Sequence, residues 1–273
     1  MKRSYLSGPY LVWAAAFILL PLAMVIYYGC TDESGHFTLA NIAAMKDWVH
    51  YRAFTSSLIL AFLATLICLL IAYPLAWFLR QHFRNSSSFV VMLFILPMWI
   101  NFLLRVLALQ VILSKSGMLN ALLRFLGFPA LRLMYTKAAI LIGMVYDYIP
   151  FMILPIYNAL TKIDESVVEA AMDLGADKKT VFRRIIFPLS LPGVISGIIM
   201  VFIPNISEFA VADILGGSKI LLFGNVIEQE FNVNSNWNLG SGLSVVLMLF
   251  VFASMAIMNR KDSKEEGGGV PLW

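Results

Sequence analysis

Long apolar stretches alternate with short polar ones along most of this chain. Five stretches contain no Asp, Glu, Lys or Arg, and each is long enough to cross a bilayer as a helix, which takes roughly 20 apolar residues. They are 4–31, 53–79, 85–104, 185–207 and 231–259. A sixth stretch, 138–160, is interrupted only by Asp147. The apolar residues run continuously instead of alternating, which favours membrane helices over a membrane β-barrel.

The pattern therefore predicts an all-α polytopic membrane protein with six transmembrane helices. We expect a transmembrane domain over 1–260 and a tail over 261–273 without regular structure. The spans are expected at about 9–29, 53–79, 88–112, 137–160, 189–212 and 238–258. The polar segment 161–188 connects the fourth and fifth spans, and a short amphipathic helix is expected within 113–136.

Composition supports this interpretation and excludes several classes of protein. Hydrophobic residues make up 60% of the chain and charged residues 13%, whereas a soluble domain carries about 25% charged residues. The mean hydropathy is +0.82. The net charge of +4 comes without a single basic patch, so no nucleic-acid partner is expected. Cys30 and Cys68 form no CxxC pair and the histidines form no HExxH, so no metal site is predicted.

The distribution of Lys and Arg predicts the orientation. With the N-terminus inside, 12 basic residues fall on the cytoplasmic side and 8 on the outer side. The densest short cluster lies in 161–188. Because basic residues favour the cytoplasmic side and six spans return the chain to the side where it began, both termini are expected in the cytoplasm.

The segment 161–188 has the pattern of two short helices joined by a turn. Val167, Val168, Ala171 and Leu174 repeat at the spacing of one helix face. Gly175 is suited to end the first helix in a left-handed conformation. Asp177 is suited to cap the second helix. The alternative is an amphipathic segment that lies on anionic lipid through its basic residues, which are Lys178, Lys179, Arg183 and Arg184.

Residues 169–193 read EAAMDLGADKKTVFRRIIFPLSLPG. This stretch resembles the EAA coupling loop of type I ABC-importer permeases, in which Glu-Ala-Ala precedes a Gly and the loop ends in Ile-x-Leu-Pro. Ile185 and Pro188 fit that ending, with Phe187 in place of Leu. The resemblance implies the type I permease fold and contact with an ATPase. The implied ATPase-coupling residues are Glu169, Ala170, Ala171, Asp173, Gly175 and Ala176.

Further segments resemble the first membrane subunit of spermidine/putrescine ABC importers. These segments read AYPLAWFLR, PMWINFLLR, LSKSGMLN, YIPFMILPIY and LGGSKILLFGNVIEQEF. The resemblance implies a multi-pass subunit of the bacterial inner membrane, forming half of a polyamine pathway. The implied partners are a second permease, a dimer of ATP-binding subunits and an extracytoplasmic polyamine-binding protein, all in membrane lipid. The chain has no GxxxxGK[ST] motif, so ATP and Mg²⁺ are expected on the separate ATPase and no cofactor on this chain.

Acidic and aromatic residues in and near the spans suggest a path for a cation. Asp147 lies about 15 Å into its span, where an ionised carboxylate needs a partner or water. Tyr148 and Trp99 offer aromatic faces to an ammonium group. Glu208 and Asp213 follow near the outer end of the fifth span, but five residues separate them, so they need not face one lumen.

Each of these residues has a structural alternative. Asp147 is placed to pair with Arg105, Glu208 to bind a docked partner, and Trp99 to face lipid. At the level of function, the alternatives are a permease for ferric iron, sulfate or another small solute, and a secondary transporter driven by protons through Asp147. No nucleophile–base pair or metal cluster in the sequence indicates a membrane enzyme.

Overall fold

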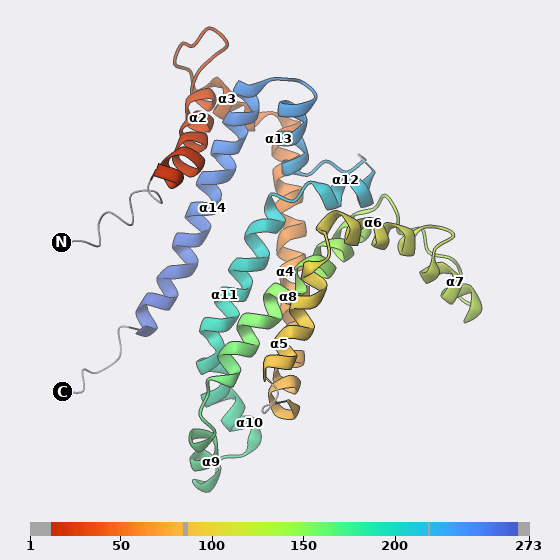
Figure 1. The fold of residues 1–273 in the computed structure, drawn as a ribbon, viewed down its shortest axis with the longest axis vertical. Coiled ribbons are helices and arrows are strands. Elements are labelled where there is room, and N and C mark those ends of the chain that lie inside the picture. The colour runs from red at the N-terminus through yellow and green to blue at the C-terminus, as the bar shows by residue number, and fades with distance from the viewer. Residues whose placement is uncertain (1–11, 84–86, 218, 267–273) are drawn as a thin grey trace, which may run out of the picture.

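The computed structural model describes residues 12–83, 87–217 and 219–266 as a bundle of helices (Figure 1). Six helical stretches are long and apolar enough to cross a membrane, which confirms the predicted all-α, six-span class. Within the described residues, β-structure is limited to one isolated bridge between Thr31 and Phe37.

Three long helices form the centre of the bundle. They are α4 (Trp48–His82), α8 (Lys137–Thr161) and α11 (Phe187–Ile206). All three pack against one another. The buried side of α4 carries small residues three or four positions apart, among them Ala64, Cys68, Ala72 and Ala76. This spacing places one smooth face against α8, which is how membrane helices approach closely without large apolar side chains between them.

The contact between α8 and α11 depends on glycine. A Cβ atom on Gly193 would lie 2.4 Å from the Cβ of Ala159 and 2.6 Å from the carbonyl oxygen of Pro155. One turn further along α11, a Cβ on Gly197 would lie 2.8 Å from the sulfur of Met152. The two helices therefore touch through backbone, as in other small-xxx-small contacts.

We expect Gly193→Leu to destabilise the fold, because the added side chain meets the backbone of α8. Overpacking of this kind costs about 1–3 kcal/mol or more. Fluorescence-detected gel filtration after heating in detergent would measure the lowered melting temperature. Met200→Phe is the matched control, since it enlarges an exposed side chain on the same helix. An unchanged melting temperature for Gly193→Leu would contradict this account of the crossing.

The third span differs from the single helix expected at 88–112. It is divided into α5 (Ser87–Ile95), a short 3-10 turn (Leu96–Trp99) and α6 (Phe102–Leu113). Pro97 has no N–H to continue a helix. The Asn101 side chain then accepts hydrogen bonds from the N–H groups of Leu103 and Leu104, at 2.9 and 3.4 Å, and so begins a new helix. The helical stretch that is long and apolar enough to be the third membrane span is therefore Phe102–Phe125, which replaces the expected 88–112.

The fifth span also ends earlier than the expected 189–212. It starts at α10 (Lys178–Val181) and continues without interruption to Ile206, the last residue of α11. The N–H of Ser207 bonds to the carbonyl of Pro204 at 3.2 Å, which closes the last turn. A separate helix, α12 (Ala210–Gly216), follows after the break. The break places Glu208 in a loop between two helices.

The first and last spans pair with each other beside the central helices. α2 (Leu20–Gly29) packs on α14 (Trp237–Glu266), and Figure 1 shows the two side by side. The expected start of the first span, 9–11, lies outside the described residues. The tail expected from 261 is helical as far as Glu266, because α14 continues, and 267–273 lie outside the described residues.

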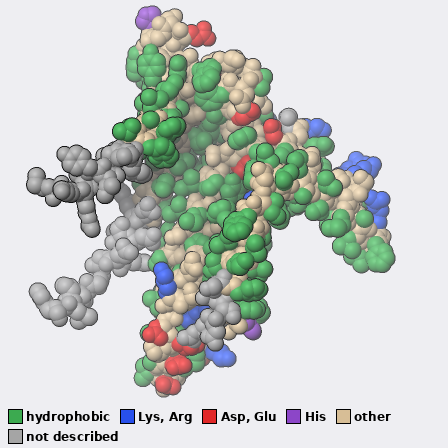
Figure 2. All heavy atoms as spheres, viewed as in Figure 1, with side chains coloured by type: hydrophobic (Ala, Val, Ile, Leu, Met, Phe, Trp, Pro, Cys, Tyr) green, Lys and Arg blue, Asp and Glu red, His purple; other side chains and the backbone are tan. Residues whose placement is uncertain are grey.

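Short helices complete the two ends of the bundle. One end carries α9 (Glu165–Asp173) and α10, and the opposite end carries α3 (Ala40–Ala43) and α13 (Phe223–Asn232) (Figure 1). The amphipathic helix expected within 113–136 is present as α7 (Met118–Phe125). On the face shown in Figure 2, acidic and basic side chains gather at the α9 end and basic ones at α7, with a largely hydrophobic surface between.

Candidate functional site

The segment between α8 and α11 forms a helical elbow, defined here as α9, the turn at Gly175 and α10. Gly175 has a φ of +86°. The N–H of Ala176 donates to the carbonyl oxygen of Ala171 at 3.1 Å. The N–H of Gly175 donates to the carbonyl oxygen of Met172 at 2.9 Å. This pair of bonds is the Schellman motif, which needs a left-handed residue at the glycine position. The prediction that Gly175 ends the first helix in a left-handed conformation is confirmed.

Aspartates cap both helices of the elbow. The Asp164 side chain accepts from the N–H of Ser166 at 3.1 Å and begins α9. The Asp177 side chain accepts from the N–H of Thr180 at 3.3 Å, which confirms the predicted cap of α10. The hydrogen bonds from Thr180 hold the pKa of Asp177 below its ordinary value. The turn is therefore defined by local hydrogen bonds on both sides.

The elbow is attached to the core on one side and exposed on the other. Val168 and Val181 are buried in the same cluster as Leu79 at the end of α4. The Arg80 guanidinium donates to the carbonyl of Ile163 at 3.3 Å. The elbow is therefore packed against the end of α4 and is continuous with α11.

The exposed side holds the residues implied in ATPase coupling. Glu169, Ala170, Asp173 and Gly175 are exposed, and Ala171 and Ala176 are half-buried. The expectation of one common apolar face over Val167, Val168, Ala171 and Leu174 is wrong in part. Val168 points into the core, whereas Val167 is 46% and Leu174 89% exposed.

Helical periodicity placed Leu174 on the same face as Val168, but the structure buries Val168 and exposes Leu174. Leu174 is the C-cap residue that follows the last residue of α9, and its side chain is exposed at the tip of the elbow. Its neighbours on the exposed side of the elbow are small or acidic residues, among them Ala170 and Asp173.

A second group of functional candidates is buried between α6, α8 and the loop before α12. A guanidinium nitrogen of Arg105 lies 3.4 Å from a carboxylate oxygen of Asp147. Arg105 is 9% exposed and Asp147 1%. This pair is the structural alternative named above for Asp147. Neither carboxylate oxygen of Asp147 accepts a hydrogen bond from the described residues. The contact with Arg105 is therefore an ion pair that no hydrogen bond to Asp147 reinforces.

Glu208 is held beside this pair. Its carboxylate accepts a hydrogen bond from the Tyr148 hydroxyl at 2.8 Å and another from the N–H of Val211 at 3.1 Å. The second bond gives a partner to one of the N–H groups in the first turn of α12, which have no acceptor within the helix. Glu208 is 6% exposed. The Asp147 and Glu208 carboxylates are close enough to interact electrostatically. They therefore belong to one cluster, called the buried cluster, which consists of Arg105, Asp147, Tyr148 and Glu208.

The remaining predicted path residues lie apart from the buried cluster. Trp99 is 79% exposed in the turn between α5 and α6. Asp213 is exposed on α12, where its carboxylate accepts from the Asn225 side chain at 3.4 Å. Partial desolvation and the charge of Glu228 raise the pKa of Asp213. Sequence reasoning missed Asn225, which also donates to the carbonyl of Phe209, because its partners are far along the chain.

The buried cluster contains more acid than base. When both carboxylates are ionised, one negative charge among these side chains is left without a basic partner. A buried charge without a partner costs several kcal/mol, which a cation arriving beside it would offset. Within the described residues, no group of three or more His, Cys, Asp or Glu is arranged to hold a metal ion.

Comparison with known proteins places these features in a family. Residues 64–264 match the model of the binding-protein-dependent transport system inner membrane component family. The chain is similar to the spermidine/putrescine transport system permease protein PotB of Salmonella typhimurium, with 37% identity covering 92% of this chain and 93% of that protein. The corresponding protein of Escherichia coli is 38% identical, with 93% and 98% covered.

The fold is shared with solved transporters of low sequence similarity. A bacterial ABC transporter involved in import of the acidic polysaccharide alginate matches with a TM-score of 0.71 at 15% identity, covering 94% of each chain. The same kind of transporter, in complex with a periplasmic protein bound to alginate pentasaccharide, matches at 0.74 and 14% identity, covering 96% of this chain and 94% of that one. Six apolar helices, the elbow and the matched model together show that this chain belongs to the binding-protein-dependent transport system inner membrane component family, the membrane permeases of ABC importers.

Proposed function

We propose that this chain is a permease subunit of an ATP-driven polyamine importer and forms half of the translocation pathway. The observation that carries the transport assignment is the exposed elbow at one end of the bundle, fixed to α4 and α11 (Figure 1). The polyamine assignment is supported by the relatives named for spermidine and putrescine transport, at 37–38% identity over nearly the whole chain.

In this proposal the elbow lies in the cytoplasm and fills a cleft on a separate ATPase, which binds ATP and Mg²⁺. Both chain termini are then cytoplasmic. Ala170 and Ala171 let the ATPase surface approach the backbone of α9, and Leu174 adds an apolar contact at the tip. A second permease completes the pathway, and a polyamine-binding protein docks on the end that carries α13. Nucleotide-driven movement of the ATPase dimer rocks α4, α8 and α11 and opens the pathway alternately to the two sides.

The buried cluster supports a cationic cargo. Its unbalanced negative charge attracts an ammonium group. The Tyr148 ring lies beside Glu208 and offers a cation–π surface at the same place. The fifth span ends before Glu208, so this residue lies in the non-helical break between α11 and α12. Non-helical backbone at this position fits a wall of a cavity and not a lipid-facing surface. Trp99 and Asp213 are assigned to the outer part of the same path.

We expect Glu208→Gln to lower kcat/KM for spermidine uptake roughly tenfold, equivalent to about 1.4 kcal/mol of lost attraction in the transition state. The amide keeps the shape of the side chain and the bond to Val211, but its NH2 group replaces the oxygen that accepts from Tyr148, so the charge and that bond both change. Tyr148→Phe is the matched control for the neighbouring hydrogen bond and should have a smaller effect. Asp147→Asn belongs in the same assay, and unchanged uptake would remove Asp147 from the path.

The function itself is tested with proteoliposomes that hold the two permeases and the ATPase, supplied with the binding protein. Labelled spermidine should accumulate only with ATP on the ATPase side, and unlabelled putrescine should compete. Accumulation of ferric iron or sulfate without any of spermidine would contradict the cargo. Uptake by this chain alone under a pH gradient would contradict the ATP-driven mechanism.

A further inference from the structure

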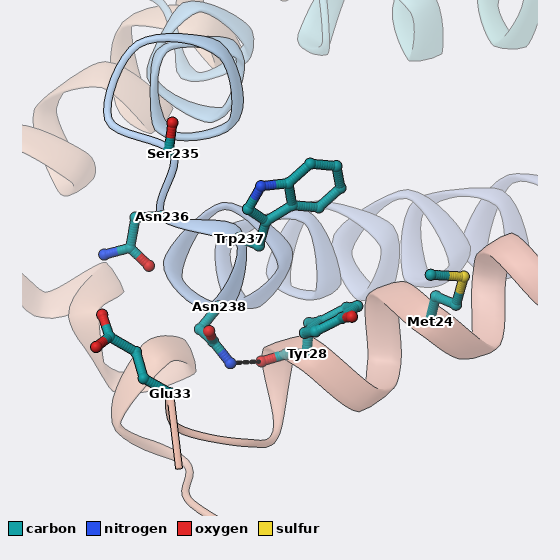
Figure 3. Close-up of a pocket in the computed structure, with 7 residues that line it drawn as sticks. All are labelled: Met24, Tyr28, Glu33, Ser235, Asn236, Trp237 and Asn238. Atoms are coloured by element: carbon teal, nitrogen blue, oxygen red, sulfur yellow. Dashed lines mark hydrogen bonds between the residues drawn. The ribbon is translucent and has the colours of Figure 1, made fainter. Parts of the chain in front are cut away.

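A cavity of about 520 Å³ opens where the first and last spans leave the membrane, at the end of the bundle opposite the elbow. The last turns of α2 and the first turn of α14 form its walls (Figure 3). Its lining includes the Glu33 carboxylate, the rings of Tyr28 and Trp237, the amide of Asn236 and the thioether of Met24. None of these residues takes part in the elbow or the buried cluster.

The chemistry of the lining changes along the cavity. Figure 3 shows the Glu33 carboxylate pointing toward the Asn236 side chain at one end. The rings of Tyr28 and Trp237 come next, with centroids 6.5 Å apart. Met24 lies one turn deeper along α2 and is 45% exposed. The cavity therefore runs from a polar, acidic end at the loop to an apolar end on a membrane span.

The walls are held in place before any ligand arrives. The Asn238 side chain donates to the carbonyl of Tyr28 at 3.1 Å and to that of Thr31 at 2.7 Å, which ties the start of α14 to the end of α2. A Cβ on Gly29 would lie 3.1 Å from the backbone of Ser241, so the two helices also touch directly. By contrast, the Glu33 carboxylate has no hydrogen bond or ion pair from another described residue.

We propose that this cavity binds the headgroup of a zwitterionic aminophospholipid, phosphatidylethanolamine, in the outer leaflet of the membrane. The ammonium group pairs with Glu33 and lies against the rings, which attract cations. The phosphate accepts hydrogen bonds from neutral donors, namely the Asn236 amide and the Trp237 indole N–H. The glycerol and acyl chains continue past Met24 into the bilayer. Tyr and Trp at this depth match the aromatic belt of membrane proteins.

The charges that line the cavity select this occupant over two others. One carboxylate balances the single ammonium of phosphatidylethanolamine, whereas a polyamine carries several cationic groups. No Lys or Arg among the described residues lines the cavity, so a purely anionic lipid finds no ion pair there. A separate cavity of about 380 Å³, lined by Arg52, Lys137 and Lys219, has the opposite character and serves as an internal contrast.

The test is a lipid titration of the purified full chain, read by native mass spectrometry, and it requires neither cargo nor ATPase. Phosphatidylethanolamine should be retained roughly tenfold more tightly than phosphatidylglycerol, about 1.4 kcal/mol. Glu33→Gln should remove that preference, and so should Trp237→Leu. Glu230→Gln is the matched control, because it neutralises a carboxylate at the same end outside the cavity and should leave the preference unchanged. Melting temperatures establish that the variants are folded.

Three results would overturn the proposal. One is equal retention of phosphatidylethanolamine and phosphatidylglycerol by the unsubstituted chain. Another is an unchanged preference in a folded Glu33→Gln variant. The third is displacement of phosphatidylethanolamine by spermidine in a manner that depends on Glu33, which would make the cavity a polyamine site. Failure of polyamine import leaves this test intact, since lipid retention does not depend on the cargo.

Discussion

Glu169→Lys combined with Gly175→Asp should separate this chain from its ATPase and reduce uptake to background. Glu169 is exposed on α9, and Gly175 forms the turn at a φ of +86° with open space around it. Reversal of a charge in a protein interface costs roughly 2–5 kcal/mol, which weakens binding by about 30-fold or more. The amount of ATPase recovered with an affinity-tagged permease measures the effect.

The matched control for this double variant is Lys115→Asp, another charge reversal at an exposed position that lies outside the elbow. It should leave ATPase recovery unchanged. A Cβ at Gly175 meets no atom within 4 Å, but a φ of +86° strains a residue with a side chain by about 1–3 kcal/mol. Melting temperatures of both variants must therefore show that the permease is folded. A complex that purifies intact from the Glu169→Lys, Gly175→Asp variant would refute the assignment of the elbow as the coupling site.

Arg105→Met should destabilise the chain by about 3–5 kcal/mol, the usual cost of removing one member of a buried ion pair. Met keeps most of the apolar stem of Arg, so the loss of stability comes from removal of the charge and not from lost packing. The substitution leaves Asp147 and Glu208 as two buried carboxylates without a cation. Thermal unfolding in detergent measures the change in stability.

Adding Asp147→Asn to Arg105→Met should restore much of the lost stability, because the uncompensated carboxylate is removed. Arg132→Met, at an exposed position, is the control and should stay within about 0.5 kcal/mol of the unsubstituted chain. If the double variant is no more stable than Arg105→Met alone, the 3.4 Å contact between Arg105 and Asp147 is not an energetic pair.

Local features of the elbow were predictable from the sequence. Gly175 and Asp177 act through backbone bonds to residues within a few positions, so their residue types alone indicate a left-handed turn and a helix cap. The six spans were predictable for a similar reason, since the length of an apolar run directly reflects the thickness of the bilayer.

The buried cluster was only partly predictable. Asp147 and Glu208 were identified as charges in or near spans, but their partners depend on how α6, α8 and α12 pack. Asn225 gave no signal, because its contact with Asp213 joins two helices across a loop. Helical periodicity also misplaced Leu174, since a residue at a turn no longer follows the face of the helix before it.

The boundaries of the third and fifth spans were missed because hydropathy does not detect a break within an apolar run. Pro97 and Asn101 stop and restart the helix in the third span, and the Glu208 side chain begins α12 after the fifth. All of these residues lie in or beside apolar sequence.

The most direct test of the coupling claim is a proximity measurement at Ala170. In a chain with Cys30→Ser and Cys68→Ala, the Ala170→Cys variant carries a single thiol on the exposed side of α9, to which a short photoreactive cross-linker is attached. In the assembled transporter, illumination should join this chain to the ATPase. Adducts with lipid alone would show that the elbow lies on the membrane surface and would contradict the account.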